Sequence, residues 1–112
     1  MTMGKVKDIT LIDGAIATGA QASVSPLGTR RTFHATGFTS AGAGAATIGV
    51  EVSNDGTNFV EIDELSLTLG TTIVAASQDV FAHDAAYKFV RGNVKTISGT
   101  DAEVTLTMGV QL

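Results

Sequence analysis

The chain of 112 residues is long enough for one domain with one hydrophobic core but too short for two. Hydrophobic residues make up 44% of the chain, which excludes a chain that is disordered throughout. No stretch approaches the roughly 20 consecutive apolar residues that a helix needs to cross a bilayer. The net charge is -4, and the Lys and Arg residues are dispersed apart from Arg30 and Arg31, so we expect no direct binding of nucleic acid.

The first 28 residues contain one strand pattern followed by a segment of small side chains. The apolar residues of the strand pattern are Val6, Ile9, Leu11 and Ile12. The pattern stops at Asp13-Gly14, a strong turn dipeptide, and residues 15–28 provide little to bury within a sandwich. We interpret residues 1–28 as an extended arm or an edge strand and expect them to lie across a neighbouring subunit. The candidate interface residues of this segment are therefore Val6, Ile9 and Leu11.

Residues 29–39 predict a strand with an aromatic side chain on each face. Phe33 lies on one parity and Phe38 on the other, so we expect both faces to be covered and take Phe38 as a candidate interface residue. The segment 40–45 contains only Ser, Ala and Gly. Because its glycines lack the spacing of a phosphate-binding loop, we interpret it as a flexible hairpin loop.

The best strand alternation lies between residues 47 and 62. Ile48, Val50 and Val52 alternate with polar residues, and apolar residues resume at Phe59. The segment between them contains Asn54, Asp55 and Gly56, residue types that tolerate positive φ or bond their own backbone. The pattern predicts a hairpin with a structural turn at these three residues and positive φ at Gly56.

The remaining sequence predicts another hairpin and two further strands. Apolar residues alternate over 65–69, and a turn at Gly70 before the apolar run 73–76 predicts another hairpin. Residues 84–97 predict a strand in which Arg91 lies among aromatic residues, so it could stack on a ring or pair with a carboxylate across the sheet. Arg91 is also a candidate interface residue. The strand over 102–111 alternates to the end of the sequence.

These elements predict an all-β chain. About eight short strands joined by turns, rich in Thr, Val and Ile and with no convincing helix, are typical of an antiparallel β-sandwich of jelly-roll type over residues 29–112. Charged residues make up only 16% of the chain, against about a quarter in an average domain. Either partners cover part of the surface, or Thr, Ser, Gly and Asn supply its polarity.

No pattern in the sequence predicts catalysis or a bound cofactor. The two histidines, His34 and His83, lie in no HExxH motif, although Asp79 and Asp84 flank the second. No G-x-S-x-G turn presents a nucleophile, and the absence of cysteine excludes disulfides and thiolate metal sites. The turn at 54–58 could supply oxygen ligands to calcium, but such a turn needs no metal and the EF-hand pattern is absent. We expect no enzyme, no cofactor and no metal site.

Three segments carry a resemblance to a known group of proteins. Residues 45–59, 87–91 and 97–106 are similar to segments of small tailed-phage virion proteins, in particular the cement or decoration proteins of capsids. The resemblance implies a homo-oligomer, with a dimer favoured and a trimer possible. It would bind the outer surface of the major capsid protein shell, stabilise the particle and be made in the host cytoplasm. It implies no contact with a membrane.

The same turn and the aromatic-Val-Arg strand also resemble discoidin-type carbohydrate-binding sandwiches. Those domains are longer and have more exposed aromatic residues in their loops. The chain has no Trp and one Tyr, which provides poorly for stacking against sugars. A glycan-binding module of a phage tail or surface protein is therefore the alternative function.

Overall fold

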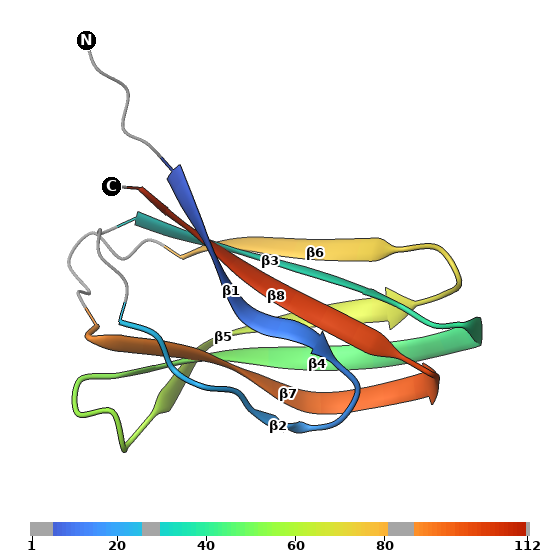
Figure 1. Ribbon diagram of the computed structural model, residues 1–112, viewed down its shortest axis with the longest axis horizontal. Helices are drawn as coiled ribbons and strands as arrows, with labels where there is room; N and C mark the ends of the chain where they lie inside the picture. Colours follow the sequence, from blue (N-terminus) through green and yellow to red (C-terminus); the bar gives the residue numbers. More distant parts are fainter. Residues whose placement is uncertain (1–5, 26–29, 81–86, 112) are drawn as a thin grey trace, which may run out of the picture.

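Eight strands form two antiparallel sheets of four in the computed structural model, which describes residues 6–25, 30–80 and 87–111 (Figure 1). In order across the first sheet, the strands are β1 (Val6–Ala15), β8 (Glu103–Gln111), β3 (Arg30–Phe38) and β6 (Val74–Val80). In the second sheet they are β2 (Gly19–Ala20), β7 (Phe89–Thr100), β4 (Ala41–Ser53) and β5 (Val60–Leu69). The predicted antiparallel sandwich of about eight strands is confirmed.

The strand order is that of a jelly roll. β1 pairs with β8, β2 with β7, β3 with β6 and β4 with β5, as in one long hairpin that has been rolled into two sheets. Four connections therefore lie at one end of the sandwich, residues 16–18, 39–40, 70–73 and 101–102. We call this the distal end, because β1 starts and β8 stops at the opposite end (Figure 1).

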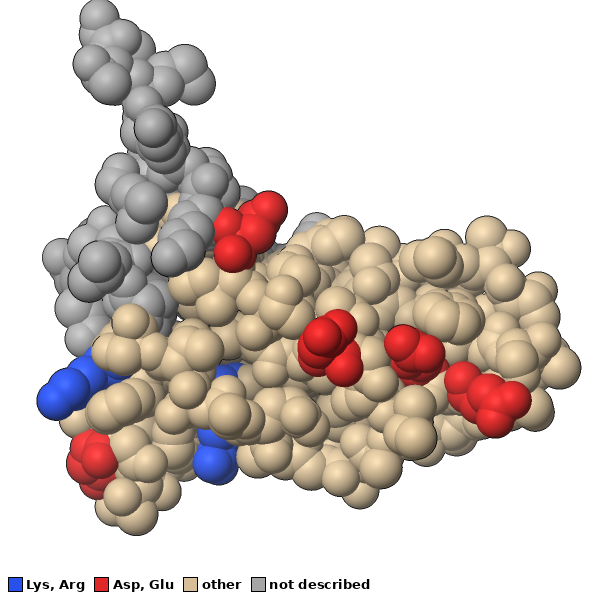
Figure 2. Space-filling model, viewed as in Figure 1, with Lys and Arg blue, Asp and Glu red and all other residues tan. Residues whose placement is uncertain are grey.

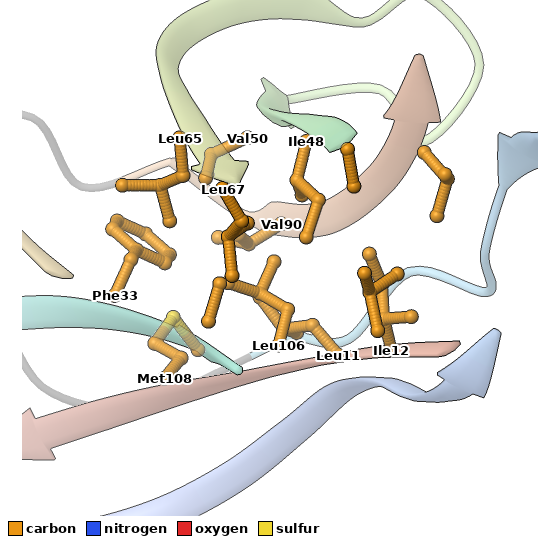
Figure 3. Close-up of a cluster of buried hydrophobic side chains, with 14 of the residues drawn as sticks. Leu11, Ile12, Phe33, Ile48, Val50, Leu65, Leu67, Val90, Leu106 and Met108 are labelled. Atoms are coloured by element: carbon orange, nitrogen blue, oxygen red, sulfur yellow. The ribbon is translucent and has the colours of Figure 1, made fainter. Parts of the chain in front are cut away.

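The core lies between the two sheets and is formed by alternate residues of their strands (Figure 3). The predicted inward faces of the best alternating strands are confirmed by their burial. The buried residues on these strands include Ile48, Val50 and Val52 of β4, Val90 and Val94 of β7, and Val104, Leu106, Met108 and Val110 of β8. In β3, Phe33 is buried while His34 is exposed, so the two faces of this strand differ. Within this chain, the outer face of β3 is therefore uncovered at His34.

β1 is an edge strand of the first sheet, one of the two interpretations of this segment, and it pairs with β8 of its own chain. Its register with β8 runs from Val6 opposite Gln111 to Ala15 opposite Val104. The side chains of Leu11 and Ile12 are only 4% and 1% exposed. Burying them stabilises the fold of this chain, and within this chain Leu11 is a core residue.

Two predicted hairpins are crossovers between the sheets instead. β3 and β6 belong to the first sheet, whereas β4 and β5 belong to the second, so the β3–β4 and β5–β6 connections pass from one sheet to the other. The segment 40–45 is mostly strand, since β4 begins at Ala41 and pairs with β7 from there. The small side chains of residues 40–45 are the reason that this segment was interpreted as a flexible loop.

The described residues contain no helix suited to spanning a membrane.

Candidate interaction surfaces

The turn between β4 and β5 is held by the carboxylate of Asp55. It accepts hydrogen bonds from the backbone N–H groups of Asn58 at 2.7 Å and Thr57 at 2.8 Å, and from the side chains of Asn58 and Ser53 at 2.8 Å. These bonds, above all that from the Asn58 N–H, lower the pKa of Asp55 well below its ordinary value. Asn54 accepts a bond from the Lys88 N–H. The side-chain oxygens of Asp55 and Asn54 in this turn are thus engaged by donors of this chain.

Gly56 in this turn has a φ of +77°, as the sequence predicts. In this left-handed region a side chain is strained, and a Cβ at this position would also lie 3.2 Å from Cε2 of Phe89. The turn therefore rests on the aromatic ring at the start of β7.

Arg91 makes both of the contacts that its sequence position suggested. Its Nε donates to Glu51 Oε1 of β4 at 2.7 Å, and its guanidinium lies 3.8 Å from the centre of the Phe59 ring. The other carboxylate oxygen of Glu51 accepts a hydrogen bond from Asn93. We call Arg91, Glu51, Phe59 and Asn93 the Arg91 cluster. Because its guanidinium is engaged within the chain, Arg91 fixes neighbouring strands of the second sheet.

A second group of charges lies on the same outer face. Nζ of Lys95 lies 2.5 Å from Glu64 and 3.1 Å from Glu61, and these carboxylates, Glu64 first, raise the pKa of Lys95. Neither this group nor Glu51 was predicted from the sequence. The antiparallel register of β4 with β7, which places Glu51 opposite Arg91, is the signal that would have revealed the first pair.

The remaining candidate interface residues do not form one surface. Val6 is opposite Gln111 at the start of β1, and its side chain lies outside the described residues. Ile9 is half-buried and packs against the core, and Phe38 is half-buried at the end of β3. These residues belong to the first sheet, whereas Arg91 belongs to the second. The structure does not bring them together.

The histidines are not assembled into a site in the described part of the chain. His34 lies exposed on the outer face of β3, opposite Thr107 of β8. His83 and Asp84 lie outside the described residues, and of Asp79 only the backbone is described. Among the described residues, no three His, Asp or Glu side chains are grouped as metal ligands would be.

The distal end has exposed side chains that were not predicted from the sequence. Ile16 in the β1–β2 connection is 73% exposed, and Ile73 in the β5–β6 connection is 66% exposed. Beside Ile16, an open hollow of about 380 Å³ is lined by Ile97 and by the acidic residues Asp101 and Glu103, among others. Asp101 has a φ of +49° and accepts a hydrogen bond from the Ser40 hydroxyl at 2.9 Å. Apolar and acidic side chains therefore lie side by side at this end.

Charge is distributed unevenly over the face seen in Figure 2. Acidic side chains lie at intervals along the length of the molecule, whereas the Lys and Arg side chains visible on this face lie towards the end opposite to the distal end. On this face the distal end presents only acidic and uncharged side chains. Such a surface favours a partner that supplies apolar and cationic groups.

The fold defines a class of protein, an antiparallel jelly-roll sandwich of two four-stranded sheets. Two solved structures share this fold. SPBc2 prophage-derived protein YomS is similar with a TM-score of 0.61 and 14% identity, over 98% of this chain and 96% of that chain. PBSX exported protein XepA is similar with a TM-score of 0.59 and 13% identity, over 94% of this chain but only 37% of XepA. No family model and no curated protein matches the sequence.

Proposed function

We propose that the chain is a structural virion protein, a cement that binds the outer surface of the major capsid protein shell and stabilises the particle. The observation that carries the proposal is the likeness in fold to YomS, which spans nearly the whole of both chains and whose name places it in a prophage. The similarity of residues 45–59 to segments of capsid decoration proteins supports the same assignment.

The distal end is the surface that we assign to shell binding. Ile16 and Ile73 are exposed there, and large apolar side chains held out in water gain free energy when a partner covers them. The neighbouring carboxylates of Asp101 and Glu103 would favour a seam of the shell with cationic side chains. Contacts repeated over a symmetric shell act multivalently, so one modest interface per copy is sufficient.

The proposal is tested by adding the purified chain to shells that lack it and measuring co-sedimentation. The double variant Ile16→Asp, Ile73→Asp should bind at least about tenfold more weakly, since it replaces both exposed apolar side chains of the distal end by charged ones. The control is Val60→Asp, because Val60 is also 60% exposed but lies at the opposite end of β5. All variants should keep the wild-type melting temperature.

Equal loss of binding with Val60→Asp would overturn the assignment of the distal end, and no binding of the wild-type chain would overturn the cement function. A signal on a glycan array without particle binding would instead support the carbohydrate-binding alternative. XepA is named as an exported protein. If this chain were also exported, it would be recovered free in the medium, and that result would contradict a place on the particle.

A further inference from the structure

We propose that strand β6 pairs antiparallel with β6 of a second copy, across a two-fold axis at Ser77. The pairing would join the two first sheets into one sheet of continuous hydrogen bonding. This inference concerns the isolated protein and does not depend on shell binding. It follows from comparing the sheet edges, because an exposed edge offers unpaired N–H and C=O groups to another strand.

The edges of the second sheet are both blocked. β2 is only two residues long, too short to template a partner. β5 has a register shift opposite Val50 and Glu51. Next to this shift, Asp63 is the register partner of the buried Val50, and its Oδ2 is buried with no hydrogen-bond partner among the described residues. A bulge and an inward-directed carboxylate are both devices that prevent pairing at an edge.

The β1 edge of the first sheet is blocked in a similar way. Its register with β8 shifts twice, between Thr10 and Ile12 and between Ile12 and Ala15. These irregularities twist the strand away from a straight pairing partner. The segment also carries the charged residues Lys7, Asp8 and Asp13.

β6 has none of these protections. Its seven residues pair with β3 in unbroken register, from Val74 opposite Gly37 to Val80 opposite Arg31. Its sequence contains no Pro and no Lys, and its single charged residue is Asp79. No strand of the described chain covers its other side. β6 is therefore the edge at which another strand fits.

The sequence of β6 suits a second copy of itself. A two-fold axis at Ser77 places Val74 opposite Val80 of the second copy, and Asp79 opposite Ala75. Like charges directly opposite each other would destabilise the pair, and this register places none opposite each other. Seven paired residues form a small interface, so we expect a dimer whose population depends on concentration. An isologous contact of this kind closes at two copies.

The chain has no cysteine, so one introduced thiol reports the pairing directly. At the two-fold axis, the two copies of residue 77 have Cα atoms about 4.5–5.5 Å apart, which is within the range for a disulfide. Ser77→Cys should therefore form a covalent dimer under mild oxidation. Ser66→Cys is the matched control, since Ser66 is exposed on the blocked edge β5.

Light scattering on the eluting protein gives a second readout. The wild-type mass should rise from monomer to dimer as concentration increases, and Ser77→Lys should weaken dimerisation at least tenfold, whereas Ser66→Lys should not. The proposal is overturned by a monomer at all concentrations or by an assembly that persists in Ser77→Lys. Equal cross-linking of Ser66→Cys and Ser77→Cys would also overturn it. If Ser77→Lys fails to fold, the cross-linking result decides.

Discussion

Replacing Gly56 should show how much the β4–β5 turn contributes to the stability of the sandwich. At a φ of +77°, alanine costs about 1 kcal/mol in backbone strain, and the β-branched side chain of valine costs more, about 2–3 kcal/mol. The new Cβ would lie 3.2 Å and 3.3 Å from Cε2 and Cζ of Phe89. Because Phe89 is only half-buried, its ring can move by a few tenths of an ångström, so strain dominates the cost.

Two other glycines separate strain from contact. Gly42 has a φ of +71° with open space around its Cβ position, so Gly42→Ala should also cost about 1 kcal/mol. Gly70 has open space and no positive φ, so Gly70→Ala should change stability by less than about 0.5 kcal/mol. A chain of this length loses about 4 °C in melting temperature per kcal/mol.

Thermal unfolding followed by circular dichroism measures the series. We expect a loss of about 8–12 °C for Gly56→Val, about 4 °C for Gly56→Ala and Gly42→Ala, and almost none for Gly70→Ala. The reasoning is refuted if Gly56→Val melts within about 2 °C of wild type, or if Gly70→Ala loses as much as Gly56→Ala.

The remaining predictions concern β1 and the charge of the turn. Ile12→Ala should cost about 2–5 kcal/mol in urea unfolding because Ile12 is fully buried, while the exposed Ile16→Ala should be nearly neutral. Deleting residues 1–14 should prevent folding, and a folded, monomeric truncation would contradict the assignment of β1 to its own core. The lowered pKa of Asp55 means that its carboxylate stabilises the fold above the ordinary value of 3.8, and this stabilisation is lost as the pH falls through the folded pKa. The stability difference between wild type and Asp55→Asn should therefore be full at neutral pH and shrink in acid, whereas a constant difference would rule out this source of stability.

Alternation of apolar residues predicted the buried faces of β4, β7 and β8 because their large apolar side chains occupy alternate positions, which point to one face of a sheet. The same rule misjudged β1. Leu11 and Ile12 are neighbours in sequence and both are buried, which a regular strand does not allow. The register shifts on either side of Ile12 make it possible. Such irregularities have no period, so a pattern of alternation does not reveal them.

The candidate surfaces depend on which strands become neighbours. The sequence pattern did not predict all of these neighbours, and this omission affected the candidate surfaces more than the misjudged β1 did. Alternation gives the face of a residue but not the sheet that its strand joins, so the β3–β4 and β5–β6 crossovers were taken as hairpins. The distal end follows from those crossovers. It brings Ile16 beside Asp101 and Glu103, which are more than 80 positions away in the sequence. The kinds of contact that Arg91 makes, with an aromatic ring and with a carboxylate, were predicted without their partner residues. An arginine among strand aromatics has few other ways to satisfy its guanidinium group.

The most direct test of a cement function is the protein composition of purified particles. Particles of the phage or prophage that encodes the chain would be isolated by density gradient and quantified by mass spectrometry against the major capsid protein. We predict a fixed ratio of this chain to the coat subunit, comparable in number and unchanged by repeated banding. Its absence from banded particles, or loss in proportion to washing, would contradict the proposal that it is a structural component of the shell.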